Sequence, residues 1–151
     1  MQVFTFDLED DYLLIGIHST EEDYRLAYLI NQHLNTKFVR YKHNLDFENS
    51  TIEFPLFEYK DEKTYLNYYL INNKCIQVVD DQYNDGLFGG NYSTTSYLLP
   101  EIKKVDFLLK IEGCTSEFIL ELVDKLNKIS EIITSFQIET NTLKSKYNLI
   151  F

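Results

Sequence analysis

The sequence predicts an α+β fold in which helices pack on an antiparallel sheet. Two segments carry apolar residues at helical spacing, and each lies between segments that alternate like strands. No Pro/Gly/Ser-rich linker divides the 151 residues, so we expect a single domain over residues 1–151. The order of elements is typical of a ferredoxin-like two-layer sandwich, an antiparallel sheet with two helices on one face and an extra hairpin.

The first elements are expected to be two strands and a helix. Residues 3–6 and Tyr12–His18 are predicted to form an antiparallel hairpin across an acidic turn. Ser19 and Glu22 have the spacing of a capping box, which predicts a helix start. Residues 37–41 then alternate as a strand. The apolar stripe of the helix consists of Leu26, Leu29, Ile30 and Leu34.

The middle of the chain is expected to be an aromatic hairpin over residues 51–71, with its turn near Asp61 and Glu62. Pro55 cannot donate a ladder hydrogen bond, which favours an edge or a bulge in the first arm. Lys74–Val79 is expected to extend the same sheet. Residues 81–96 lack periodicity and contain three of the five glycines, which predicts a mobile loop.

The last third repeats the strand-helix-strand pattern. Residues 105–111 and 131–138 are predicted to be strands. Between them, Thr115 or Ser116 is expected to cap a second helix. The stripe of that helix consists of Ile119, Leu122, Val123 and Leu126.

Composition bounds the function. The net charge is −10, with 24 acidic against 14 basic residues, and no basic residue precedes Arg25. Nonspecific nucleic-acid affinity comes from Lys and Arg, so direct binding of nucleic acid is disfavoured. The acidity suits a protein partner with a basic surface, although net negative charge also simply supports solubility. Cys75 and Cys114 stand alone, so neither a disulfide framework nor a zinc site is expected.

The chain offers few groups for catalysis, and we expect no cofactor and no enzyme activity. The N-terminal segment lacks a signal-peptide pattern and no segment has the length of a membrane span, which favours a cytoplasmic protein without membrane contact. His18 is the best-placed general base, with Glu22 or Cys114 as conceivable neighbours, but a strand-end histidine needs only a hydrogen bond. An N-terminal acidic cluster is more typical of a solvated turn than of a cation site. It consists of Asp7, Glu9, Asp10 and Asp11.

Two apolar segments are candidates for partner binding. Tyr65, Tyr68 and Tyr69 lie on one arm of the aromatic hairpin. Such rings stack bases on some RNA-binding sheets, but strand aromatics are more commonly core residues, and exposed ones are typical of protein interfaces. The tail at 143–151 ends in Leu149, Ile150 and Phe151, too apolar for a frayed end. We expect it to dock on this domain or on a partner.

Residues 99–107 and 143–151 together resemble the bacterial IPExxxVDY family, which is named after its own motif and has no assigned activity. Pro100, Glu101, Val105 and Asp106 match the motif, whereas Leu99 and Phe107 replace its isoleucine and tyrosine. The resemblance therefore implies no catalytic residue. We expect structural roles for the four matching residues, with Asp106 accepting hydrogen bonds from the turn at 99–104 because a carboxylate in an apolar strand needs donors.

The function favoured by these observations is a non-enzymatic acidic interaction domain. It would be an accessory component of a larger cytoplasmic assembly, with the transcription or translation machinery as a candidate host. The alternative is an ACT-like regulatory domain that binds a small molecule as a dimer. An enzyme that uses His18 or the acidic cluster ranks third.

Overall fold

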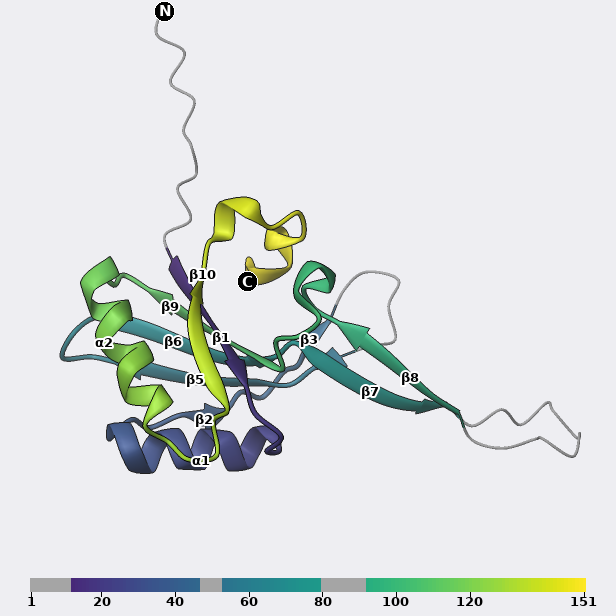
Figure 1. The fold of residues 1–151 in the computed structure, drawn as a ribbon, viewed down its shortest axis with the longest axis horizontal. Helices are drawn as coiled ribbons and strands as arrows, with labels where there is room; N and C mark the ends of the chain where they lie inside the picture. Colours follow the sequence, from purple (N-terminus) through teal and green to yellow (C-terminus); the bar gives the residue numbers. More distant parts are fainter. Residues whose placement is uncertain (1–11, 47–52, 80–91) are drawn as a thin grey trace, which may run out of the picture.

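A computed structural model describes residues 12–46, 53–79 and 92–151 and confirms an α+β fold. Its main sheet is antiparallel with six strands in the order β10-β1-β9-β6-β5-β2 (Figure 1). These strands are β1 (Tyr12–His18), β2 (Val39–Arg40), β5 (Leu56–Asp61), β6 (Leu66–Asn72), β9 (Phe107–Glu112) and β10 (Thr134–Ile138). The α-helices of the described residues are α1 (Asp23–Leu34) and α2 (Ser116–Asn127).

Shorter elements complete the described chain. The strand pairs are β3 (Leu45–Asp46) with β4 (Glu53–Phe54) and β7 (Lys74–Val79) with β8 (Tyr92–Tyr97). Three 3₁₀ helices follow, namely η1 (Pro100–Ile102), η2 (Thr140–Thr142) and η3 (Lys146–Leu149).

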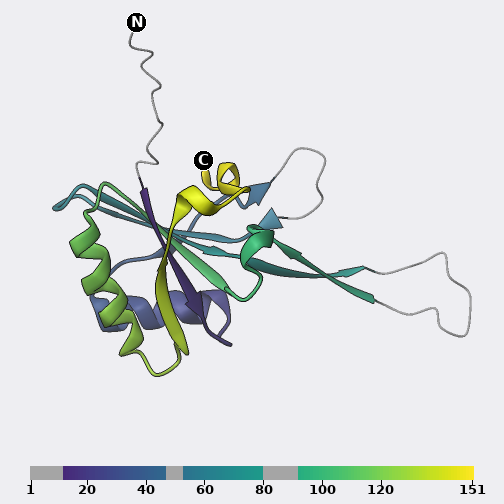
Figure 2. The same cartoon turned by 45° about the horizontal axis from the view of Figure 1, so that its top comes forward.

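Both helices pack on one face of the sheet (Figure 2). Ile15 and Ile17 of β1 point toward this face, because alternate residues of a strand face the same side. The predicted helical stripes supply the other half of this core. Their buried members are Leu26, Leu29, Ile30, Ile119, Leu122 and Leu126.

The opposite face of the sheet is also buried, which the two-layer prediction did not include. Leu14 and Leu108 belong to a second apolar cluster on this side, together with Leu99 and Leu149 from segments outside the sheet. Strand β9 explains the difference, since its consecutive apolar residues are typical of a strand covered on both faces. Gly16 of β1 leaves room for the side chains of Val105 and of Ile138 on the neighbouring strand β10, because a Cβ at Gly16 would lie 3.1 Å and 2.8 Å from them.

Several predicted boundaries are wrong. Lys74–Val79 does not extend the main sheet but pairs with β8 in a separate arm that projects from the body (Figure 1). Residues 92–96 of the predicted loop therefore form a strand. Residues 81–91 of that loop lie outside the described residues, as do the predicted strand at 3–6 and the acidic cluster at 7–11.

The predicted capping box of α1 also fails. Glu22 is the N-cap residue and makes no side-chain cap hydrogen bond. Ser19 instead donates from Oγ to the carbonyl of Glu131 at 2.9 Å and accepts from the backbone N–H of Glu21 at 3.2 Å. The hydroxyl thus ties the end of β1 to the segment that precedes β10, a long-range contact that local spacing does not reveal.

The cap of α2 gives a direct test of the local structure. Thr115 Oγ1 accepts a hydrogen bond from the backbone N–H of Phe118 at 3.3 Å, whereas Ser116 is the first helical residue. Thr115→Ala should lower the free energy of unfolding by about 0.5–2 kcal/mol, the usual cost of a lost N-cap. Ser116→Ala is the matched control and should change it little. Equal urea midpoints for the two variants would contradict this assignment of the cap.

Candidate functional site

The two segments that carry the family resemblance meet on the helix-free face. We call residues 98–106 the motif turn and residues 143–151 the tail. Ser145 Oγ donates to the carboxylate of Glu101 at 2.6 Å, and Asn148 Nδ2 donates to the carbonyl of Leu98 at 2.8 Å. Figure 1 shows the tail beside the turn in the upper part of the molecule. Two segments about 40 residues apart in sequence thus form one surface.

The motif turn is built as its sequence suggests. Pro100 occupies the first turn of η1, where its missing N–H costs no helical hydrogen bond, and Leu99 before it is extended. Val105 is buried in the cluster beneath the tail. The turn therefore presents Pro100 and Glu101 outward while Leu99 and Val105 anchor it to the sheet.

A buried asparagine fixes the turn. The side chain of Asn73, which follows β6, is fully buried. Its Nδ2 donates to the carbonyls of Val105 at 2.8 Å and Ile102 at 3.1 Å, and its Oδ1 accepts from the backbone N–H of Leu99 at 2.8 Å. One amide thus satisfies backbone groups at both ends of the turn. The sequence analysis missed Asn73, because an asparagine after a strand is an ordinary turn residue.

Asp106 has hydrogen-bond partners, but they do not come from the turn at 99–104 as expected. Its Oδ2 accepts from the backbone N–H of Ser19 at 3.0 Å and lies 3.6 Å from Nδ1 of His18. Backbone pairing with β1 explains this position. The backbone N–H of Asp106 donates to the carbonyl of Ile17, which places the carboxylate beside the end of β1.

His18 therefore has Asp106 as its acidic neighbour, which the sequence did not identify. Of the neighbours the sequence did suggest, Cys114 lies at the other end of the sheet. It follows Glu112, which pairs with Tyr12 at the start of β1, whereas His18 ends that strand. A nucleophile-base pair of Cys114 and His18 is excluded by this register.

A buried lysine holds the tail. Lys110 of β9 is 3% exposed, and its Nζ donates to the carbonyl of Leu149 at 2.6 Å. Glu112 Oε1 lies 3.4 Å from the same nitrogen. Burial lowers the pKa of Lys110, and the nearby carboxylate of Glu112 opposes that shift.

Aromatic rings surround the same ammonium. The ring centroids of Phe151, Tyr12 and Tyr69 lie 4.1, 4.9 and 5.5 Å from Lys110 Nζ, within the range of cation-π attraction. Phe151 and Tyr69 also meet edge to face, with centroids 5.2 Å apart. The tail thus supplies one ring and one carbonyl to a charge in the middle of the sheet. The signal available in the sequence was a lone lysine inside the apolar strand Phe107–Glu112.

The residues proposed for partner binding do not form one surface. Tyr68 is buried on the helix side, and burial together with the nearby Asp61 charge raises its pKa to about 12. Tyr69 lies on the opposite face, as strand alternation requires. Tyr65 is 86% exposed at the hairpin turn, with a φ of 58° that bulky residues rarely adopt. Leu149 is buried, whereas Ile150 and Phe151 are exposed.

Comparisons with models of known protein families, with curated proteins and with solved structures find no match. Within the described residues, no three His, Cys, Asp or Glu side chains gather as a metal site would require. No helix in that part of the chain is long and apolar enough to cross a membrane.

Asn73 and its neighbour Asn72 form a matched pair for testing the turn. Asn73→Ala should lower the free energy of unfolding by at least about 2 kcal/mol, because the buried Leu99 N–H and Val105 carbonyl both lose a partner, at about 1–3 kcal/mol each. Oδ1 of Asn72 has no hydrogen-bond partner among the described residues, so Asn72→Ala should stay within about 0.5 kcal/mol. Urea denaturation decides the matter, and similar losses in both variants would refute the role given to Asn73.

The tail offers a second matched pair. Leu149 is buried in the sheet cluster and Ile150 next to it is 73% exposed. Leu149→Ala should cost about 2–5 kcal/mol if the tail is packed on its own domain, as is usual for a large core side chain. Ile150→Ala should have almost no effect on the melting temperature of the isolated protein. A melting temperature insensitive to Leu149→Ala would show that the tail is not docked in solution.

Proposed function

We propose that this chain is a non-enzymatic interaction domain that binds a protein partner through its tail. The observation that carries the proposal is an anchored segment whose apolar side chains are partly or largely exposed. Tyr147, Ile150 and Phe151 are 66%, 73% and 44% exposed. Their neighbours Leu149 and Ser145 are buried. Exposed aromatic and aliphatic side chains that lie together are typical of a protein interface.

The anchoring supports this reading because a fixed segment loses little conformational entropy when it binds. The hydrogen bonds of Ser145, Asn148 and the Leu149 carbonyl hold the tail at three points. Ordering of a loop or side chain on binding reduces affinity. In this chain the backbone of the tail is already ordered before a partner binds. The tail would act as a preformed ridge rather than as a flexible arm.

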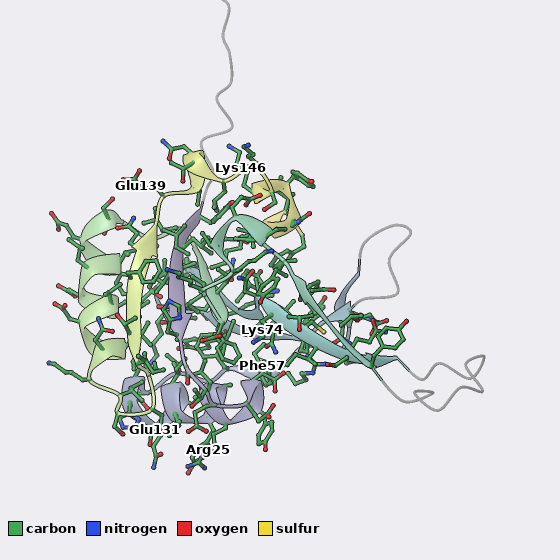
Figure 3. The ribbon with its side chains drawn as sticks, turned by 45° about the vertical axis from the view of Figure 1, so that its right-hand side comes forward. Arg25, Phe57, Lys74, Glu131, Glu139 and Lys146 are labelled. Atoms are coloured by element: carbon green, nitrogen blue, oxygen red, sulfur yellow. The ribbon has the colours of Figure 1, made fainter. Side chains whose placement is uncertain are left out.

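The net charge of the chain indicates the kind of partner only in general terms. The net charge of −10 favours attraction of a basic partner at long range. Around the tail the charges are mixed, and Figure 3 shows Lys146 and Glu139 at the end of the molecule opposite Arg25 and Glu131. We therefore assign binding energy at the tail to apolar contact, and the general acidity to steering and to the exclusion of nucleic acid.

We also propose that the fold is ferredoxin-like and that the chain is related to the IPExxxVDY family. Strands β1, β6, β9 and β10 lie in the order β10-β1-β9-β6, with one helix after β1 and one after β9. That order supports a ferredoxin-like core with β2 to β5 inserted as the extra hairpin region. The contact between the motif turn and the tail supports kinship with the IPExxxVDY family. We place the protein in the cytoplasm, without membrane contact, as an accessory component of an assembly such as the transcription or translation machinery.

An ACT-like regulatory domain remains the second candidate, because one edge of the sheet is open. Within the described residues β10 pairs only with β1, so its outer edge could pair with a second copy. Mass photometry separates the two candidates. A dimer at nanomolar concentration would favour the regulatory domain, and a monomer would favour the interaction domain.

Two exposed isoleucines test the interface. Ile150 and Ile133 are 73% and 71% exposed. Ile133 lies outside the tail, on the connection between α2 and β10, where its backbone N–H donates to the carbonyl of His18. In affinity purification of the tagged chain from its own cells, Ile150→Asp should lose the partner that the unchanged chain recovers. Ile133→Asp should retain it, and both variants should keep their melting temperature. Equal recovery with both variants would contradict a partner surface on the tail.

A further inference from the structure

A hollow of about 160 Å³ lies on the helix side of the sheet, where the end of α1, the middle of α2 and the turn between β5 and β6 meet. Leu34, Phe118 and Leu122 form the aliphatic and aromatic part of its wall on the helices. Tyr59 and Tyr68 line it from the sheet. The volume is large enough for several water molecules, and therefore for a small organic group.

The hydroxyl of Tyr68 is the group that indicates a ligand. Tyr68 lines the hollow although its side chain is only 6% exposed, and its hydroxyl forms no hydrogen bond with any of the described residues. A buried polar group normally has a partner, which can be a bound molecule. Burial and the charge of Asp61 raise the pKa of Tyr68 to about 12, so the phenol is neutral near pH 7. Its oxygen can therefore accept a hydrogen bond from a ligand.

The carboxylate of Asp61 makes the potential beside this hydroxyl negative. Burial raises the pKa of Tyr59, and the adjacent Asp61 charge raises it further. The same carboxylate acts on Tyr68, and no positive charge among the described residues counteracts either effect. Asp61 is itself fixed, because its Oδ1 accepts from the backbone N–H of Lys63 at 3.0 Å. A carboxylate that accepts such bonds still has room for further donors, so a positive group beside Tyr68 would be stabilised.

The charged groups around the hollow leave an excess of carboxylate. Asp61 and Glu121 line it together with the ammonium of Lys125. Glu121 and Lys125 lie one helical turn apart on α2, so their charges offset each other. In the turn between β5 and β6, Lys63 acts on Asp61 and is itself preceded by Glu62. Three carboxylates against two ammonium groups favour a cationic ligand over an anionic one.

We propose that this hollow binds a small alkylammonium group. The ammonium would donate hydrogen bonds to the Tyr68 hydroxyl and to Asp61. The carbon chain would lie against Leu34, Phe118 and Leu122. An anion would be repelled by Asp61, and a neutral molecule would gain nothing from the negative potential. The site is separated from the partner surface on the tail by the sheet and does not depend on it.

n-Butylamine and its neutral counterpart 1-butanol are suitable probes, because they have the same length and the amine is protonated at pH 7. In a ¹H–¹⁵N NMR titration of the full chain, butylamine should shift the amide signals of Asp61, Tyr68, Phe118 and Leu122 in a saturable manner. Butanol should bind about five- to tenfold more weakly, as expected for loss of a charge-assisted hydrogen bond.

The alkylammonium group can belong to a free amine or to a lysine side chain of another protein. Nα-acetyl-lysine methylamide carries the same butylammonium group and separates the two sources. Binding as tight as that of butylamine would assign the site to a lysine side chain, and weaker binding would assign it to a free amine.

Two neighbouring tyrosines provide a matched pair of variants. Tyr68→Phe removes only the hydroxyl and should weaken butylamine about five- to tenfold. Tyr69→Phe, on the opposite face of the same strand, should bind butylamine as the unchanged chain does. Asp61→Asn should weaken butylamine and leave butanol unchanged, and the dispersion of the spectra reports whether each variant is folded. The proposal is overturned if butylamine gives no saturable shift at these residues, if butanol binds equally well, or if Tyr69→Phe has the same effect as Tyr68→Phe.

Discussion

The packing of the helix-free face of the sheet depends on the interaction between the ammonium of Lys110 and the tail. It lies in a central strand, where an uncovered position would reach water, yet it is almost fully buried. A buried charge is costly unless hydrogen bonds and nearby groups offset the loss of solvent. The tail supplies the Leu149 carbonyl and the Phe151 ring, and the sheet supplies Glu112 and two tyrosines. The tail therefore offsets the cost of burying Lys110, and Lys110 in turn stabilises the docked position of the tail.

This dependence explains why the tail and the motif turn lie together on one side of the molecule. The helix side has the regular alternation of an amphipathic α+β core. The other side is closed by the motif turn and the tail, which contain only short 3₁₀ helices and therefore need polar side chains as partners for their remaining backbone groups. Asn73 anchors the motif turn and Lys110 anchors the tail. The exposed apolar side chains of the tail lie on this side, because the tail is bound to the motif turn and to Lys110.

The sequence predicted what local periodicity encodes and missed what distant contacts decide. The helical stripes, the strand at Tyr12–His18 and a cap at Thr115 or Ser116 follow from residues close together in the chain. The roles of Asn73, Lys110 and Ser19 could not be inferred, since each bonds to a segment at least 26 residues away. The same limit applies to Asp106. Its place in an apolar strand predicts that its carboxylate needs a hydrogen-bond donor, but the donor, the backbone N–H of Ser19, lies 87 residues away in sequence.

The candidate site shows this division clearly. Apolarity alone indicated that the tail docks, and the motif alone drew attention to the turn. Their mutual contact through Glu101 and Ser145 is a property of the fold. Tyr68 illustrates the same limit, because a strand pattern does not tell which face of a sheet covered on both sides receives the ring.

A double-mutant cycle between Lys110→Met and deletion of residues 149–151 tests the central claim most directly. With the tail in place, Lys110→Met removes a hydrogen bond and the attraction of the rings. Without the tail, Lys110 is exposed to water and its replacement should matter little. The two destabilisations measured by urea denaturation should therefore sum to more than that of the double variant, by about 1–3 kcal/mol. Additivity to within about 0.5 kcal/mol would contradict the mutual dependence of Lys110 and the tail.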